Sequence, residues 1–350
     1  MTLLASLSLL QTAQASINYA TVFVYHRFGD QRYPTTSVSL KDFRKELKYL
    51  KEKGYKVIKL STLYRIISSG EKIPPKTVVI TIDDGYRTTY RAFKILKEFN
   101  FPFTVFLYME AVGRYPDFLT IEQIREMEKS GLAEFENHLY SHPSLAKLRA
   151  KLTKEEYLKV LRREAELSEK RFKKIFGRKP EFLAFPYGEY DKISVKFFKE
   201  RGYKLLLTQD RGSYDGKRVL VPRFAVVGSQ SGFKRFVREL RIEPLPVKEH
   251  RPEIGLTCEN PVEVAFRLKD PQNYKNCWIY LSKKGWVKGV SEGEWVRSPR
   301  KLWAERLRSR AGIRCTDRET GRKAEFFFLF IEGNLKGAKA PEVVKRGFHQ

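Results

Sequence analysis

The sequence predicts an α/β fold: a distorted (β/α) barrel followed by a small, β-sandwich-like C-terminal domain. Apolar, strand-like runs alternate with amphipathic segments of helical length over residues 17–242, which is typical of βα units around a parallel sheet. Short alternating runs with turn residues replace this pattern over residues 256–350. A chain of 350 residues, 42% of them hydrophobic, is long enough for two domains.

The expected elements of the barrel follow in order along the chain. The helix over residues 39–55 opens on the potential cap Ser39 and stops at Gly54, and the other helices are recognised by apolar residues at helical spacing. Strands are expected over residues 19–28, 76–84, 102–109, 133–138, 181–188, 203–210 and 219–226, and further helices over residues 90–100, 120–131, 154–176 and 192–202.

The two ends of the barrel have different characters. Residues 1–15 are predicted to be a signal peptide, because an apolar run precedes a small-x-small pattern at 13–15. This stretch has no basic first region, so a start further upstream or a buried N-terminal element is the alternative. Residues 243–255 are rich in proline and charge and are predicted to be a linker.

The net charge of +27 favours two interpretations. Lys and Arg are spread among 41 acidic residues, and this dispersed excess resembles the composition of heat-adapted, thermophile proteins. The functional alternative is electrostatic attraction to an acidic envelope polymer. No nucleic-acid partner is expected, since no helix-turn-helix, RNA-binding or zinc-finger signature is found. No apolar run is long enough for a transmembrane span.

All three cysteines, Cys258, Cys277 and Cys315, fall in the C-terminal region. In an exported protein they allow one disulfide and one remaining thiol, with the pairing left open. Three buried free thiols are the alternative.

Two adjacent carboxylates, Asp83 and Asp84, end the strand over residues 76–84. Neighbouring carboxylates repel each other, so a cation or a proton is expected close by. Catalytic groups of a parallel barrel gather where the strands end, and Gly85 permits a turn there.

His138 and His142 are spaced four residues apart after another strand. They would share a face if the chain turned helically, which suits binding of one metal ion. With one carboxylate they would form a three-ligand site that leaves positions for water and substrate.

Three motifs in this order, TIDDGY, NHLYSHPSL and FPYG, resemble those of the polysaccharide deacetylases, the NodB-homology group of carbohydrate esterases. The resemblance implies a distorted (β/α) barrel that removes N-acetyl groups from amino-sugar polymers with a divalent metal, usually zinc, with cobalt or nickel as alternatives. It implies attack by metal-bound water with Asp83 as general base. It also implies the metal ligands Asp84, His138 and His142.

The same resemblance implies substrate contacts for Pro186 and Tyr187, and the backbone N–H of Tyr187 would bind the developing oxyanion. Tyr86 is expected to line the groove. The chain departs from the family at Ala184, where an arginine often orients the catalytic aspartate. Arg223 is the candidate replacement, and an ordinary surface charge is its alternative.

The family's late histidine, which acts as general acid, has no counterpart before residue 243. His26 follows the first strand and is the candidate for a groove residue and acid, with a hydrogen-bonded rim histidine as the alternative. His250 and His349 are expected at the surface. The tryptophans are expected mainly in the core of the C-terminal domain, with sugar binding as the alternative: Trp278, Trp286, Trp295 and Trp303.

The favoured substrate is a poly-N-acetylglucosamine-type exopolysaccharide, because alanine at position 184 together with the YHR of the first strand resembles the biofilm-polysaccharide branch of the family. Peptidoglycan comes next. The protein is expected to be exported and periplasmic or associated with the envelope. A non-catalytic carbohydrate-binding protein that retains the deacetylase fold is the alternative function.

Overall fold

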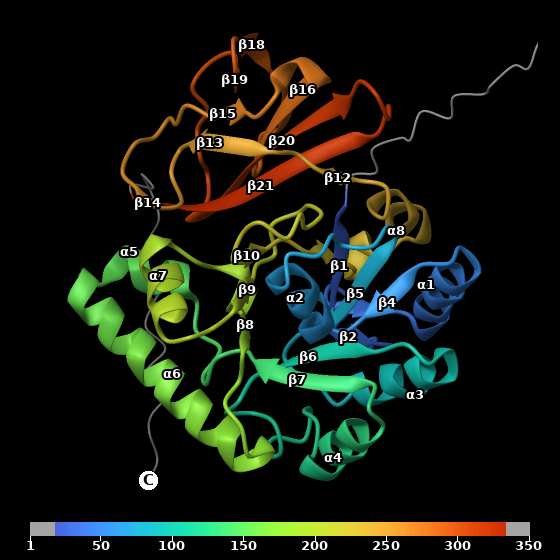
Figure 1. Ribbon diagram of the computed structural model, residues 1–350. Coiled ribbons are helices and arrows are strands. Elements are labelled where there is room, and N and C mark those ends of the chain that lie inside the picture. The colour runs from blue at the N-terminus through green and yellow to red at the C-terminus, as the bar shows by residue number, and fades with distance from the viewer. Residues whose placement is uncertain (1–17, 334–350) are drawn as a thin grey trace, which may run out of the picture.

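The computed structural model describes residues 18–333 and shows an α/β barrel with strand-rich sheets packed against it (Figure 1). The predicted fold class is confirmed for these residues. The signal peptide predicted at 1–15 and the surface position predicted for His349 lie outside the described residues.

One nine-stranded parallel sheet forms the described part of the barrel, in the order β10-β9-β8-β7-β6-β5-β1-β11, with β4 paired to β5. The strands are short, and those in the middle of the sheet are almost entirely buried, because helices cover the outside and side chains fill the inside, whereas β4 at the side has no buried residue. The strands are β1 (Ala20–Tyr25), β4 (Lys56–Ile58), β5 (Thr77–Ile82), β6 (Phe103–Leu107), β7 (Ala133–Asn137), β8 (Phe182–Ala184), β9 (Leu205–Leu207), β10 (Leu220–Val221) and β11 (Phe224–Ala225).

A short connection joins the two ends of the barrel sheet. β10 pairs with β9 and β11 pairs with β1, so these two strands are the opposite ends of the sheet order. Only Pro222 and Arg223 separate them in sequence. The dipeptide therefore joins the two ends of the sheet and carries Arg223 at the junction.

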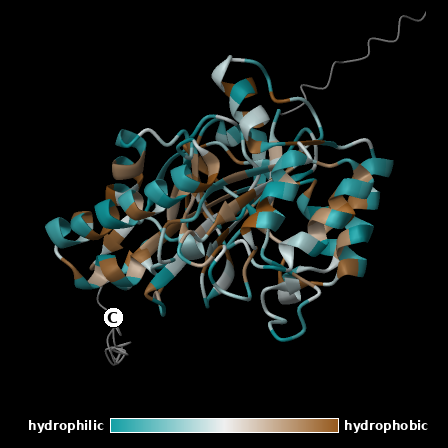
Figure 2. Cartoon of the chain, turned by 90° about the horizontal axis from the view of Figure 1, so that it is seen from below, coloured by the Kyte–Doolittle hydropathy of each residue, from teal (hydrophilic) through white to brown (hydrophobic). Residues whose placement is uncertain are grey.

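Helices surround this sheet and turn polar faces outward, whereas the strands in the middle are apolar (Figure 2). Their starts follow ordinary capping chemistry: Ser39 accepts from the backbone of Asp42, and Thr153 forms a capping box with Glu156. The helices are α1 (Leu40–Glu52), α2 (Leu60–Ser68), α3 (Thr89–Phe99), α4 (Ile121–Lys129), α5 (Leu145–Lys151), α6 (Lys154–Phe176), α7 (Lys192–Glu200) and α8 (Phe233–Glu239). The shorter elements are β2 (Arg27–Phe28), β3 (Ser37–Val38) and the 3₁₀ turns η1 (Pro186–Gly188), η2 (Gly228–Gln230) and η3 (Pro271–Asn273).

Two further sheets follow the barrel and lie over one side of it (Figure 1). The six-stranded sheet has the order β12-β21-β20-β16-β17 with β14 beside β21, and the four-stranded sheet has the order β13-β15-β19-β18. Their apolar faces share one core. The strands are β12 (Glu243–Pro244), β13 (Val247–Arg251), β14 (Gly255–Thr257), β15 (Ala265–Leu268), β16 (Tyr274–Leu281), β17 (Gly285–Lys288), β18 (Val290–Glu292), β19 (Trp295–Arg297), β20 (Arg308–Asp317) and β21 (Lys323–Glu332).

The linker predicted over residues 243–255 is not a free connection in this structure. β12 pairs with β21, and β13 pairs with β15, so most of the segment takes part in the C-terminal sheets. The abundance of proline and charge misled the prediction, because an edge strand tolerates both. The division into domains otherwise stays a prediction.

Two side-chain expectations for the C-terminal region need correction, and a third is confirmed. No tryptophan belongs to the shared core of the described sheets, and Trp278 and Trp303 are 43% and 52% exposed. His250 is not a plain surface residue, since its ring stacks on Phe328 with centroids 3.8 Å apart. The expected single disulfide is confirmed, since Cys277 and Cys315 form one between β16 and β20, and the alternative of three free thiols is wrong.

Within residues 18–333, no helix combines the length and the apolar character that crossing a membrane requires.

Candidate active site

The predicted motifs come together at the carboxyl ends of neighbouring parallel strands. Asp84 follows β5, His138 follows β7 and Tyr187 follows β8. These strands are neighbours or near neighbours in one parallel sheet, so their following loops meet at the same rim. They border a pocket of about 980 Å³, which we call the cleft. Its predicted lining residues are His26, Asp84, Tyr86, His138, His142 and Tyr187.

Three of these side chains point at one another. The Nε2 atoms of His138 and His142 lie 3.2 Å and 3.1 Å from Oδ1 of Asp84. One ligand atom from each residue lies within 4.8 Å of the other two. A single cation would therefore reach all three side chains.

The backbone that makes this convergence possible is not the helical turn that the spacing suggested. Leu139 and His142 both have left-handed backbone angles, with φ of 62° and 54°, and the segment between β7 and α5 is irregular. Buried Glu164 of α6 holds this loop, since it accepts from the backbone N–H groups of Tyr140 and Ser141. A loop fixed from outside, and not helical periodicity, brings the two imidazoles together.

Asp84 is likewise held in an uncommon conformation. Its φ is 71°, and Gly85 after it has a φ of 75°. A carboxylate-bearing residue in the left-handed region carries a small conformational cost, and such residues are concentrated at functional sites. His142 and Tyr187, which line the same cleft, share this conformation, and so does Leu139 in the loop that carries His142.

A carbonyl group fixes the ring orientation of His138. Nδ1 of this buried imidazole lies 2.7 Å from the carbonyl oxygen of Ala184, so Nδ1 carries the proton and donates it. Nε2 is then left with a lone pair facing Asp84. Carbonyl partners of this kind orient metal-binding histidines in proteins.

The donor set fits a divalent cation. Within the described residues, Oδ1 of Asp84 is buried and has no hydrogen-bond partner, even though two imidazole nitrogens face it. Burial would raise the pKa of Asp84, but His138 and His142 outweigh it and hold that pKa well below its usual value. An ionised carboxylate oxygen beside two imidazole nitrogens is a donor set that zinc and similar ions accept.

Asp83 is separated from this group and gripped by Arg223. Both guanidinium nitrogens of Arg223 lie 2.7 Å from the two carboxylate oxygens of Asp83, and neither side chain is exposed. Arg223 also donates through Nε to the carbonyl of Thr208, at 2.7 Å. Arg223 is buried and bound to Asp83, so the alternative of an ordinary surface charge is wrong, and its role as the replacement for the arginine missing at Ala184 stays a prediction.

This pairing affects the ionisation of Asp83. Burial would raise the pKa of Asp83, but Arg223 and His138 outweigh it, so the pKa lies below its usual value. Asp83 is completely buried and lies behind the surface of the cleft. It is therefore an ionised carboxylate in a fixed orientation.

His26 lines the cleft, and one of its ring nitrogens makes no hydrogen bond in the described part of the chain. Its Nδ1 is buried without a hydrogen-bond partner among the described residues, so the alternative of a hydrogen-bonded rim histidine is wrong for this nitrogen. Burial lowers the pKa of His26, although Asp84 and Asp83 act in the opposite direction. The neutral imidazole is favoured in this structure.

The aromatic and proline residues of the motifs form the walls. Tyr187 is 44% exposed and its ring centroid lies 4.6 Å from that of His142. Tyr86 lies under the guanidinium of Arg27, 3.5 Å from its ring centroid. Pro186 is buried and supports the turn.

One wall of the cleft comes from a part of the chain that the sequence motifs did not indicate. Arg308 and Arg310 of β20 both line it. Arg308 pairs with buried Glu189 at 2.7 Å and lies over the ring of Tyr187. Arg310 donates to the backbone carbonyl of Tyr187 at 3.3 Å. Alternating arginines on a strand were the only available signal, and nothing local connects them to residues 120 positions earlier.

Comparisons with known proteins agree with this arrangement. Residues 70–206 match the family described as polysaccharide deacetylase. The putative polysaccharide deacetylase YxkH of Bacillus subtilis is 26% identical over 193 residues, which are 55% of this chain and 65% of that protein. The poly-beta-1,6-N-acetyl-D-glucosamine N-deacetylase of Staphylococcus aureus is 27% identical over 229 residues, which are 63% of this chain and 78% of that protein.

Solved structures match the same fold. The deacetylase PplD of Streptococcus pyogenes aligns with a TM-score of 0.56 at 21% identity and covers 63% of this chain and 98% of its own. IcaB from Ammonifex degensii aligns with a TM-score of 0.55 at 24% identity and covers 64% of this chain and 97% of its own. The barrel, the ordered motifs and the family match agree with one another: residues 70–206 match the polysaccharide deacetylase family, and the described barrel has the fold of the solved deacetylases.

Proposed function

We propose that this protein is a metal-dependent N-deacetylase of polysaccharides that contain N-acetylglucosamine. One observation carries the proposal: the buried, unpartnered oxygen of Asp84 faces the Nε2 atoms of His138 and His142 at the mouth of a barrel. Such an arrangement is costly without a cation, because a buried carboxylate must be compensated.

Asp84, His138 and His142 would hold the ion, with Zn²⁺ as the favoured metal and Co²⁺ or Ni²⁺ as alternatives. A divalent ion supplies Lewis acidity, which polarises an acetamide carbonyl and acidifies water. The carbonyl of Ala184 keeps Nε2 of His138 available for this purpose.

Asp83 would accept the proton of the attacking water at one of its carboxylate oxygens. Its ionised state, stabilised by Arg223, is the form that a base requires. Because both oxygens are bound to Arg223 and buried, the water would have to approach from the side of His26 and the cleft. The arginine thus holds the base in one orientation.

The remaining charges of the reaction would be handled at the walls. The backbone N–H of Tyr187 would donate to the oxyanion, and Arg310 fixes this turn by its contact with the Tyr187 carbonyl. His26 is the candidate for the group that protonates the departing amine, and it would act as the imidazolium, so its neutral form would first have to take up a proton from the cleft.

Poly-N-acetylglucosamine is the favoured substrate and peptidoglycan the next. The S. aureus relative is named for poly-beta-1,6-N-acetyl-D-glucosamine, and it supports the first choice. The same relative supports an exported, envelope-associated location, since its named substrate is a polymer of the cell exterior.

The test uses the purified protein, loaded with zinc, cobalt or nickel, and several N-acetylated glycans. Released acetate is measured with and without a chelator. We expect release that stops on chelation and returns when the metal is added back. Absence of acetate from every glycan, in protein shown to bind one metal ion, would overturn the proposal in favour of a non-catalytic sugar-binding protein.

A further inference from the structure

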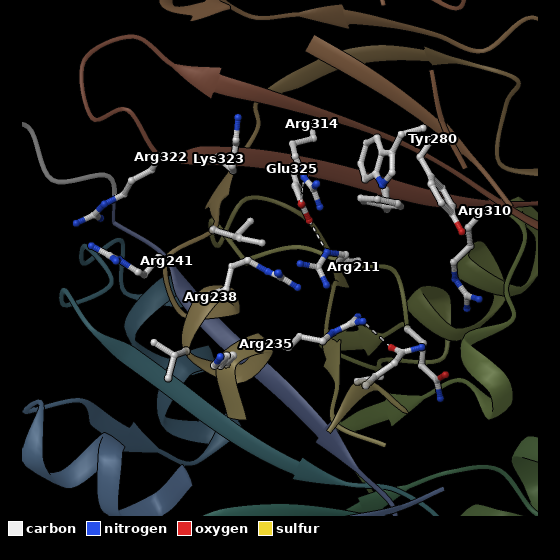
Figure 3. A pocket seen from close by; sticks show the side chains of 18 of the residues that line it. Arg211, Arg235, Arg238, Arg241, Tyr280, Arg310, Arg314, Arg322, Lys323 and Glu325 are labelled. Carbon is white, nitrogen blue, oxygen red and sulfur yellow. Dashed lines mark hydrogen bonds and ion pairs between the residues drawn. The ribbon is translucent and has the colours of Figure 1, made fainter. Parts of the chain in front are cut away.

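A second hollow lies beside the cleft, between the barrel and the six-stranded sheet (Figure 3). Its volume is about 1360 Å³. Helix α8 and the end of β11 form one side, and β16, β17, β20 and β21 form the other. We name it the arginine groove, and Figure 3 labels ten of its residues.

The groove has a surplus of positive charge. Ten Arg and Lys side chains line it, against a single acid, Glu325. Four carboxylates in or behind its walls pair with five of these cations: Asp210, Glu239, Glu243 and Glu325. When these four are subtracted from the ten, six positive charges remain. A hollow with a surplus of this size concentrates anions from solution.

Part of this surplus is not engaged by the protein. Among residues 18–333, the side chains of Lys234, Arg238, Arg241 and Arg306 form no ion pair within 4 Å. All four are exposed. Exposed guanidinium groups with free donors are suited to planar carboxylate or phosphate groups.

The floor of the groove is an aromatic row across the sheet. Tyr280 lies opposite Gly312 on one side and opposite Trp286 on the other, and Phe327 lies opposite Gly312. Residues directly opposite each other in antiparallel strands share one face, so these three rings lie together. Their centroids are 5.3–5.8 Å apart.

Gly312 makes room for this row. A Cβ atom at position 312 would lie 2.4 Å from the ring of Phe327, so only glycine lets that ring lie flat on the strand. Arg314 on the same face places its guanidinium 4.3 Å from the Trp286 ring centroid. Arginines beside an aromatic platform suit a ligand that has both apolar ring faces and acidic groups.

The arginine groove is continuous with the cleft. Four residues line both of them: Gln209, Ser282, Arg306 and Arg310. A linear polymer in the cleft can therefore extend into the groove without leaving the surface. A neutral glycan would gain little from the positive surplus, and its deacetylated product, which carries ammonium groups, would be repelled.

We infer that the arginine groove binds an acidic polysaccharide, whose sugar rings stack on Trp286 and Tyr280 and whose carboxylate or phosphate groups contact Arg238 and Arg241. This inference rests on the proposed function for one point only, namely that the bound polymer continues into the cleft as substrate. Such a polymer carries both N-acetyl and acidic groups, whereas a neutral poly-N-acetylglucosamine would occupy the cleft alone.

The experiment measures binding to four probes of similar length: hyaluronan oligosaccharide for carboxylate, poly(glycerol phosphate) for phosphate, N-acetylchitopentaose as the neutral glycan, and oligothymidylate. The full chain is compared with R238E/R241E and with R162E/R163E. The second variant makes the same change of charge on α6, away from the groove, where both arginines are exposed and form no ion pair within the described part of the chain.

We expect at least one acidic glycan to bind, with R238E/R241E raising its Kd about tenfold or more and R162E/R163E changing it less than about twofold. W286A should also weaken the binding of acidic glycans. The better of the two acidic probes assigns the anion. Equal weakening by both double variants would mean general attraction to net charge and would overturn the inference, as would tighter binding of oligothymidylate than of either acidic glycan.

Acetate release from N-acetylchitopentaose is measured in parallel, because the neutral oligosaccharide requires only the cleft. R162E/R163E, whose substitutions lie outside both the cleft and the groove, should leave this activity unchanged. If the neutral glycan is not deacetylated but acidic glycans bind in the groove, the proposed function is wrong and the inference about the groove is supported. If the neutral glycan is deacetylated and no acidic glycan binds, the inference about the groove is wrong and the proposed function is supported.

Discussion

The cleft and the arginine groove lie side by side but use charge in opposite ways. At the cleft, Asp83 and Arg223 are buried behind the surface and bind each other, and buried Asp84 faces two histidines. In the groove, Arg238 and Arg241 are exposed and without ion-pair partners in the described chain. Buried, oriented charge suits a single reacting group, whereas exposed, mobile charge suits a long polymer.

The largest expected effect is a loss of turnover in the cleft that leaves glycan binding in the groove intact. H138A should lose the metal and lower turnover about 10³-fold or more, because a ligand and its lone pair disappear. D83N should lower turnover to a similar degree while it keeps the metal. Metal content and acetate release check both, and binding of acidic glycan should stay within about twofold of the unaltered protein. Normal turnover in D83N would exclude Asp83 as the base.

A second change tests how far burial makes the cleft rigid. R223K keeps the positive charge but cannot contact both oxygens of Asp83. Because neither partner is exposed, we expect a loss of about 3 kcal/mol in unfolding free energy together with a fall in turnover. Denaturant unfolding measures the first quantity. Unchanged stability would show that the Asp83–Arg223 pair is not the support described here.

A buried acid outside the cleft sharpens the same contrast. Burial raises the pKa of Glu46 in α1 to about 8, although the hydroxyl of Tyr25 donates to it. Folded protein therefore keeps Glu46 protonated while unfolded protein ionises it above about pH 4.5. Stability that is present at low pH should fall between about pH 4.5 and 8, by roughly 2–4 kcal/mol.

E46Q cannot ionise, so its unfolding free energy should lose this part of the pH dependence. Measured from pH 5 to 9, the variant should be close to the unaltered protein at pH 5 and more stable at pH 9. Parallel curves for the two proteins would contradict a protonated Glu46.

The smallest effect is expected at the border of the two regions. Arg308 is 46% exposed, but its partner Glu189 is completely buried and also accepts from Ser144 and the backbone of Ala146. R308A should cost about 1–2 kcal/mol of stability and lower kcat several-fold by loosening the Tyr187 turn. R308K should recover most of the stability. An R308A variant with unchanged kcat would show that the C-terminal sheet only borders the cleft.

Much of the barrel could be predicted from the sequence. Strands and helices alternate with clear periods, and caps such as Ser39 and Thr153 mark the helix starts. The set of Asp84, His138 and His142 could be proposed because each follows a strand of a parallel sheet. These signals come from residues that are close together in the sequence, so they can be recognised without the structure.

The remaining features depend on contacts between distant segments. The left-handed backbone of Leu139 and His142 is held by Glu164, which resembles any other acid of a long helix. One part of the predicted linker, β12, pairs with β21, about eighty residues later in the sequence. Another part, β13, pairs with the nearer strand β15. The arginine groove needs α8 beside β20 and β21, so the basic composition indicated its charge but not its place.

The Pro222–Arg223 junction has one more consequence. Arg223, which holds the proposed base Asp83, belongs to the two-residue connection between β10 and β11, the two ends of the barrel sheet. A chain whose final strand has not docked onto β1 therefore lacks the guanidinium beside Asp83 as well. Partly assembled molecules should be inert, and acetate release would serve as a direct readout of completed folding.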